Sequence, residues 1–215
     1  MTSNGGNVRG GGPLQSALPG FDAEPAPTDR LFFAFFPGAS AATQVEQLAA
    51  RLRDAHGLSG KPLLTERFHV TLHHLGDFAG LPPHIVAMAK EAGAAAAAAT
   101  APFEITLDRT MSFVAKPGKN PYVLLGDGGV TALVNFQLAL GAAMAKAGLK
   151  VSKAKSAYTP HVTLLYDAHR VAEHAVETVS WTANELVLVH SLLGQTKHVP
   201  LARWPLCASV KTGAR

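Results

Sequence analysis

Apolar residues recur along this 215-residue chain with two periods that alternate. Short apolar or alternating runs predict strands, and apolar residues three and four positions apart predict helices. The expected strands cover residues 31–36, 68–75, 103–113, 122–125, 158–166, 185–193 and 198–206, and the expected helices cover 39–55, 82–99 and 130–147, with a short helix or helical turn at 169–177. This order predicts an α+β fold rather than a doubly wound α/β fold.

Both ends of the chain lack such periodicity. Residues 1–29 are rich in Gly, Pro and small polar residues, which predicts a disordered N-terminal tail. Residues 208–215 predict a short C-terminal tail. We therefore expect one folded domain over residues 30–207.

Composition narrows the classes of function. A single cysteine, Cys207, excludes a disulfide framework and a cysteine-rich zinc site. No membrane-spanning stretch of about 18 apolar residues and no secretory signal is apparent, so we expect a cytoplasmic monomer that does not bind membranes. Residues 1–29 hold one cation and three anions, so the expected domain carries the whole positive excess of the +4 net charge. This excess suits an anionic partner such as RNA, although an ordinary basic surface would show it too.

One tetrapeptide occurs twice in the sequence. His-Val-Thr-Leu stands at 69–72 within RFHVTLHHLGD and at 161–164 within YTPHVTLLYD, and each copy falls in an expected strand. Two copies at strand positions indicate an internal duplication. The histidines are 92 residues apart, which fits two similar consecutive lobes.

The spacing within the motif selects a chemistry. Side chains alternate along a strand, so His69 and Thr71 share one face, as do His161 and Thr163. If the two lobes oppose these faces, two imidazoles and two hydroxyls meet. Paired imidazoles can act as general base and general acid near neutral pH, and hydroxyls can donate hydrogen bonds to phosphate oxygens. This set fits displacement at phosphorus without a metal.

With the opening RLFFAFFP and the closing ELVLVHSLLG and LARWPL, these motifs make residues 30–206 resemble the 2H phosphoesterase superfamily. Within it, the chain resembles the bacterial 2′-5′ RNA ligase / RNA 2′,3′-cyclic phosphodiesterase group. The resemblance implies a bilobal LigT-like fold, with two pseudo-twofold-related antiparallel sheets and flanking helices around a central cleft. It implies opening of 2′,3′-cyclic phosphate ends of RNA to 2′-phosphates, with reversible ATP-independent 2′-5′ ligation as a second activity. RNA ends or small cyclic nucleotides would be the partners, with no cofactor.

The resemblance also assigns roles to residues. His69 and His161 become the catalytic pair, and Thr71 and Thr163 become the phosphate-binding hydroxyls. We expect His161 to activate water and His69 to protonate the leaving 3′-oxygen, although the sequence fits either direction. Tyr166 stands where the ligase-like branch often has an arginine, so an expected phosphate cation is missing. Tyr166 itself is a candidate substrate-binding residue, although strand alternation turns it away from His161 and the cleft.

Four residues beside the motifs are further candidates for substrate binding. Lys153 and Lys155 precede the second motif and could replace the missing cation, although a solvated loop is the commoner role of such lysines. Phe68 and Tyr158 also precede the motifs. They could stack a base, although core packing is the commoner role.

The histidines after the first motif need separate treatment. We expect His73 on the cleft face, as a candidate substrate-binding residue, and His74 on the opposite face. This arrangement leaves no metal site, because no set of acidic or cysteine ligands completes one. Two other functions stay open: a phosphodiesterase acting on another cyclic or 2′-5′-linked nucleotide, and a noncatalytic RNA-binding module with the same fold.

Overall fold

The computed structural model describes residues 25–150 and 158–207. The parts of the predicted tails at 1–24 and 208–215, and the candidates Lys153 and Lys155, lie outside these ranges. The helices are α1 (Ala39–Ala55), α2 (Pro83–Ala98) and α3 (Thr131–Lys146), and the strands are β1 (Asp29–Phe35), β2 (Val70–Phe78), β3 (Phe103–Ser112), β4 (Asn120–Leu125), β5 (His161–Asp167), β6 (His174–Ala183), β7 (Glu185–Leu192) and β8 (Lys197–Pro205). Two short 3-10 turns, η1 (Thr65–Arg67) and η2 (Gly128–Val130), precede β2 and α3.

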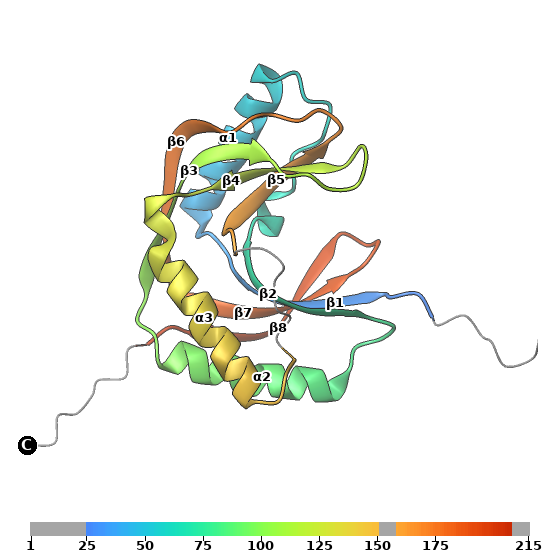
Figure 1. The fold of residues 1–215 in the computed structure, drawn as a ribbon, viewed down its shortest axis with the longest axis vertical. Coiled ribbons are helices and arrows are strands. Elements are labelled where there is room, and N and C mark those ends of the chain that lie inside the picture. Colours follow the sequence, from blue (N-terminus) through green and yellow to red (C-terminus); the bar gives the residue numbers. More distant parts are fainter. Residues whose placement is uncertain (1–24, 151–157, 208–215) are drawn as a thin grey trace, which may run out of the picture.

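The strands form two antiparallel halves that meet at one residue pair. One half has the order β6-β3-β4-β5 and the other β2-β1-β7-β8. Among the described residues, β2 and β5 pair only at Val70 and Val162. In Figure 1 the halves lie one above the other, with β5 of the upper half and β2 of the lower half where the two meet. The α+β fold with two related antiparallel sheets is confirmed, and the single pair makes them one continuous eight-stranded sheet.

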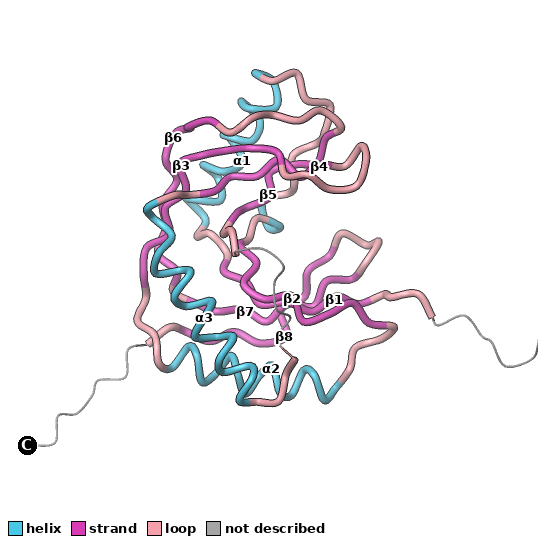
Figure 2. Tube along the Cα trace, viewed as in Figure 1, coloured by secondary structure: helices cyan, strands magenta, loops and turns pink. Residues whose placement is uncertain are grey.

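The two halves exchange segments and are not consecutive stretches of sequence. Helix α1 follows β1 but packs against β5 and β6 of the other half, whereas α2 packs against β7 and β8. Helix α3 runs along one side and contacts α2, β3 and β2 (Figure 2). The expectation of two consecutive lobes was therefore wrong. The repeated unit is strand–helix–strand, β1-α1-β2 and β4-α3-β5, and each unit is completed by strands from elsewhere in the chain.

Strand β1 lies inside its sheet and is buried on both faces. Phe33 and Phe35 face the main core, whereas Phe32 and Ala34 pack with Val189 on the other face. A strand covered on both sides reads as a continuous apolar run, which explains the sequence LFFAFF. The same run thus supplies the core and an aromatic floor on the side of the motif residues.

Residues 169–177 do not form the expected helix, because the chain enters β6 within this segment. Val179, Trp181 and Ala183 are buried and alternate with exposed residues. This period of two is typical of a strand with one covered face, and it begins near the end of the segment assigned to the helix. The helical prediction was therefore wrong, and β6 pairs with β3 at the edge of the sheet.

One segment, Gly128–Lys146, has the length and apolar composition of a membrane span, contrary to the expectation from the sequence. It comprises η2 and α3. Four of its large side chains, Leu133, Phe136, Leu140 and Met144, are buried in the core. A core helix of a globular fold passes the same test of length and composition.

Candidate active site

Each motif strand carries a β-bulge at the leucine of its tetrapeptide. In β2, Thr71 pairs with Ala34 and His73 with Phe33, so Leu72 has no partner of its own. In β5 the same shift leaves Leu164 unpaired. A bulge places two successive side chains on one face and reverses the alternation beyond it.

The bulge in β2 exchanges the expected directions of two histidines. Leu72 is buried, and His73 turns towards the helices, where its Nε2 donates a hydrogen bond to the Gln137 carbonyl of α3 at 2.8 Å. His74 lines the cleft instead. The expectation that His73 faces the cleft and His74 faces away was wrong, because it assumed uninterrupted alternation.

The bulge in β5 acts in the same way on Tyr166. Leu164 and Leu165 are both fully buried, and Tyr166 is 49% exposed and lines the cleft. The expectation that Tyr166 turns away from the cleft was wrong for the same reason. Tyr166 therefore occupies the cleft position where an arginine was expected.

A cleft of about 500 Å³ contains all four motif side chains. Thr71 lies in β2 and His69 directly precedes this strand, whereas His161 and Thr163 both lie in β5. Other lining residues include Arg30, Phe32, Leu63, Arg67, His74, Tyr166, Ser191, Thr196 and His198. The structure thus brings together the two copies of the motif.

Each of the two histidines is held by a hydrogen bond of the same kind, from Nδ1 to a backbone carbonyl. His69 Nδ1 lies 2.7 Å from the Arg67 carbonyl oxygen, and His161 Nδ1 lies 2.8 Å from the Thr159 carbonyl oxygen. A carbonyl oxygen can only accept, so each Nδ1 carries the proton. In a neutral ring, Nε2 is then an unprotonated base. Each imidazole can therefore exchange a proton through Nε2.

The strand pairing between the halves sets the two motifs side by side in antiparallel register. Val70 and Val162 pair antiparallel, and each follows its motif histidine directly. One residue to either side, this register brings His69 opposite Thr163 and His161 opposite Thr71. A phosphate between the strands would therefore meet a histidine of one motif beside a threonine of the other.

Aromatic rings enclose His69. The Phe32 ring stacks on it at a centroid distance of 5.0 Å, and the His198 ring meets it edge-on at 5.2 Å. Burial, together with the charges of nearby His198 and His161, lowers the pKa of His69 to about 4, against the opposing effect of the hydrogen bond to the Arg67 carbonyl. His69 is therefore neutral at pH 7.

His161 has a smaller aromatic contact. The Phe113 ring meets it edge-on at a centroid distance of 4.9 Å. Burial lowers the pKa of His161, and the hydrogen bond to the Thr159 carbonyl opposes this effect. Both rings are thus partly withdrawn from water inside the cleft.

Comparison with known protein families identifies the family of this domain. A family model described as 2′-5′ RNA ligase superfamily matches residues 36–195, which is more than half of the chain. The chain belongs to this superfamily. No curated protein matches the sequence.

Several solved structures share the architecture of this superfamily member. TT0787 of Thermus thermophilus matches with a TM-score of 0.64 and 20% identity, over 82% of this chain and 97% of its own. Escherichia coli LigT in its apo form gives 0.64 and 23%, over 84% and 98%. LigT complexed with 3′-AMP gives 0.62 and 24%, with the same coverage.

Two cationic side chains, Arg30 and Arg67, also line the cleft, and neither was identified from the sequence. Arg30 is held by Asp77 through two hydrogen bonds of 2.7 Å. Arg67 forms no ion pair with a carboxylate in the described ranges. Arg67 is the last residue of η1, and its position two residues before His69 in the sequence was the available signal.

His198 was missed for a different reason. It lies in β8 and reaches the cleft because β8 pairs with β7, where His198 is opposite Ser191. Burial, and secondarily the charge of Arg67, lower the pKa of His198 to about 4. A lone histidine in a weakly patterned terminal strand gives no sign of such a position.

The aromatic residues before the motifs are structural. Phe68 is fully buried in the core, so it cannot stack a base. Tyr158 donates a hydrogen bond from its hydroxyl to the Thr71 carbonyl at 2.8 Å, and burial raises its pKa. Tyr158 therefore connects the start of β5 to the first motif.

The histidines of the cleft do not form a cluster suited to metal binding. Across residues 25–150 and 158–207, no group of three or more His, Cys, Asp or Glu side chains is arranged to hold a metal ion. His73 is separated from the cleft by its turn towards α3. The cleft offers imidazoles, hydroxyls and the guanidiniums of Arg30 and Arg67.

Proposed function

We propose that this protein is an RNA 2′,3′-cyclic phosphodiesterase that opens cyclic ends to 2′-phosphates by two-histidine acid–base catalysis without a metal. One observation carries the proposal. His69 and His161 line the same cleft, and each is fixed by a hydrogen bond from Nδ1 to the carbonyl two residues before it. Two proton carriers oriented alike suit a reaction that moves two protons at one phosphate.

The reaction balances with water as the other substrate. The water oxygen forms a bond to phosphorus, and its proton passes to Nε2 of one histidine. The bond between phosphorus and the 3′-oxygen breaks, and the second histidine donates a proton to that oxygen. The product carries a 2′-phosphate and a free 3′-hydroxyl, and proton exchange with solvent restores the pair.

The low pKa of His69 favours this residue as the general base. A general base must be neutral before the reaction, and His69, with a pKa of about 4, meets this condition at pH 7. His161 then protonates the leaving oxygen. This reverses the direction expected from the sequence. The single negative charge of a bound cyclic phosphate raises the pKa of both rings, which helps His161 to hold its proton.

The remaining groups bind the phosphate. Thr71 and Thr163 can donate hydroxyl hydrogen bonds to the nonbridging oxygens, where negative charge builds up in the transition state. Arg67 supplies the positive charge that the sequence lacks at Tyr166, because it lines the cleft and forms no ion pair with a carboxylate of the described ranges. LigT is known in complexes with 3′-AMP and with phosphate, ligands that share this chemistry.

The test is the identity of the product. The protein is incubated in EDTA with adenosine 2′,3′-cyclic phosphate, and the products are resolved by phosphorus NMR. We expect 2′-AMP to form without 3′-AMP. Formation of 3′-AMP, or activity that requires added metal, would overturn the proposal.

Ligation is the finer part of the proposal. In ligation the 5′-hydroxyl of a second RNA takes the place of water. Its oxygen forms the bond to phosphorus and its proton passes to one histidine, while the bond between phosphorus and the 3′-oxygen breaks and the other histidine protonates that oxygen, so no ATP is needed. Incubation of RNA with a cyclic end and RNA with a 5′-hydroxyl, without ATP, tests for 2′-5′-linked product. Cleavage of 2′-5′-linked dinucleotides with no action on cyclic ends would favour a different phosphodiesterase. Salt-dependent RNA binding without turnover would favour a binding module.

A further inference from the structure

A second pocket adjoins the cleft beside His69. It measures about 410 Å³ and shares Arg67, Thr196 and His198 with the cleft, so these residues form a common wall. This volume falls within the range of small-molecule sites, about 300–1,000 Å³. The reacting phosphate and the second pocket are therefore neighbours.

The second pocket combines an apolar floor with a cationic rim. Phe36, Val189 and Pro200 supply apolar surface, and Lys197 and Arg203 lie beside them. Arg203 is paired with Glu185, and Glu66 also lines the pocket. Lys197 forms no ion pair with any carboxylate in the described ranges, so the rim keeps an uncompensated positive charge.

The common wall holds buried polar atoms without partners. Arg67 Nε and His198 Nδ1 are buried, and neither has a hydrogen-bond partner within residues 25–150 and 158–207. Buried polar groups without partners are uncommon because they cost stability. A guanidinium with no carboxylate partner, next to a phosphate site, is suited to a second phosphate group.

We propose that the second pocket binds the nucleotide that precedes the terminal cyclic phosphate of an RNA chain. Its base would lie on the apolar floor, and the phosphodiester that joins it to the terminal nucleotide would lie against Arg67 and Lys197. The inference rests on the proposed function, because it takes the cyclic phosphate to lie between His69 and His161. It makes an oligoribonucleotide end, rather than a free cyclic mononucleotide, the preferred substrate.

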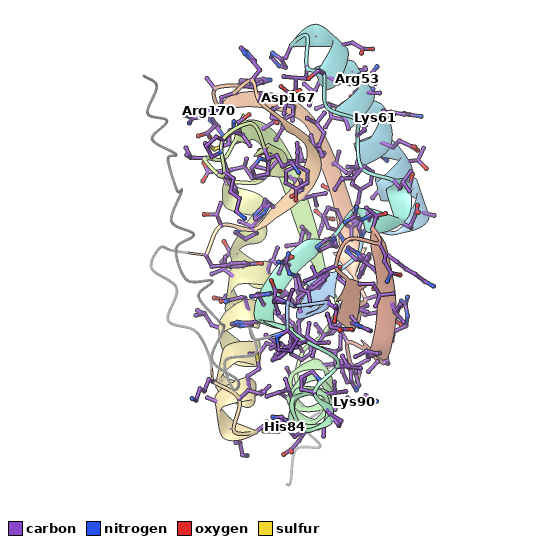
Figure 3. All side chains as sticks on the ribbon, turned by 90° about the vertical axis from the view of Figure 1, so that its right-hand side faces the viewer. Arg53, Lys61, His84, Lys90, Asp167 and Arg170 are labelled. Carbon is purple, nitrogen blue, oxygen red and sulfur yellow. The ribbon has the colours of Figure 1, made fainter. Side chains whose placement is uncertain are left out.

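The experiment compares kcat/KM for adenosine 2′,3′-cyclic phosphate and for the dinucleotide ApA with a 2′,3′-cyclic end. Two variants alter the second pocket: Pro200→Trp fills its floor, and Lys197→Gln removes its free charge. Lys90→Gln is the matched control, because Lys90 is exposed on α2 at the end of the molecule shown in Figure 3. All proteins are compared as folded full-length chains, checked by thermal unfolding.

We expect wild type to prefer the dinucleotide by about tenfold or more, since one stacked base contributes about 1–3 kcal/mol. Each pocket variant should reduce this preference by about fivefold or more and leave the mononucleotide rate unchanged, and Lys90→Gln should change neither. A cyclic mononucleotide with a 5′-phosphate separates the two parts of the site, because Lys197→Gln should slow it and Pro200→Trp should not.

The outcomes distinguish failure of the second site from failure of the proposed function. Equal kcat/KM for both substrates in wild type, or pocket variants that slow both substrates equally, would overturn the second site. If Pro200→Trp does not fold, Lys197→Gln decides alone. If wild type hydrolyses neither substrate, the proposed function fails. Tighter binding of ApA 2′-phosphate than of 2′-AMP, weakened by Lys197→Gln, would then still support the second site, and equal binding would overturn it.

Discussion

His74 and Tyr166 occupy equivalent positions in the two halves of the molecule. Each stands five residues after its motif histidine, and each is turned into the cleft by a bulge at the motif leucine. The duplication therefore extends beyond the repeated tetrapeptide to the bulge that follows it. The bulge decides which side chains can meet a substrate.

Replacing His73 and His74 separately tests this geometry. His73→Ala removes the hydrogen bond to the Gln137 carbonyl, so we expect a loss of about 1–3 kcal/mol in the free energy of unfolding, with kcat/KM unchanged. His74→Ala should lower kcat/KM and change the free energy of unfolding by less than about 0.5 kcal/mol. Urea unfolding and steady-state hydrolysis measure both. The reverse pattern would show that the bulge is misplaced.

Removing either motif hydroxyl should weaken the reaction without unfolding the protein. Thr71→Val and Thr163→Val keep the shape of the side chain but cannot donate to a phosphate oxygen. We expect kcat/KM to fall about 10- to 100-fold for each variant, since such donors act on charge in the transition state. Thr71→Ser and Thr163→Ser are the controls and should retain most activity. Valine variants as active as wild type would remove the hydroxyls from the mechanism.

The pH dependence of kcat/KM follows from the two lowered pKa values. As pH falls, activity should decrease when the base His69 becomes protonated near its pKa of about 4. As pH rises, activity should decrease when the acid His161 loses its proton, and this happens below pH 6.5 because the pKa of His161 is lowered from the ordinary histidine value of 6.5. The optimum of kcat/KM should therefore lie on the acidic side of neutrality. Initial rates at low substrate from about pH 4 to 9 measure it, and an optimum above about pH 8 would contradict the assignment.

His198 should control the acid limb of this profile. His198 packs edge-on against His69 and contributes to its low pKa. His198→Ala admits water to the His69 ring, so the pKa of His69 should rise and the acid limb should move to higher pH. His84→Ala, at the exposed position on α2 in Figure 3, is the matched control and should leave the limb in place. An unmoved limb in His198→Ala would detach His198 from the pKa of His69.

Acid should destabilise the fold before its carboxylates titrate. Burial lowers the pKa of His56, His69, His73, His161 and His198. The unfolded chain therefore binds more protons below about pH 6.5, and the free energy of unfolding falls as pH falls from there towards about 4. His69 accounts for about 1–3 kcal/mol of this loss. Urea unfolding at about pH 7 and pH 4.5 checks it, and a His69→Phe variant should show a smaller difference.

The sequence predicted the site better than it predicted the surroundings of the site. A tetrapeptide repeated in two strands located His69, Thr71, His161 and Thr163, because strand alternation near the motif holds up to the bulge. The alternation fails at Leu72 and beyond, since a bulge depends on how a strand pairs with its neighbour and leaves no mark in a single sequence.

Long-range pairing also limited the prediction of the fold. The interleaving of the halves depends on β7 and β8 returning to β1, which no local pattern shows. His198 enters the cleft through that pairing, so it could not be found from its neighbours in sequence. Arg67 could have been found, because it precedes His69 by two residues.

The most direct test of the central claim replaces each motif histidine with asparagine, which keeps a donor for the Arg67 or Thr159 carbonyl but has no titratable Nε2. Hydrolysis of adenosine 2′,3′-cyclic phosphate is measured in EDTA for His69→Asn, His161→Asn and the double variant. We expect each single variant to lose about 10²–10⁴-fold in kcat/KM, and the double variant to lose little more, because the two residues act as a unit. A single variant that keeps a rate within about threefold of wild type, less than the smallest effect expected of a proton carrier, would contradict two-histidine catalysis.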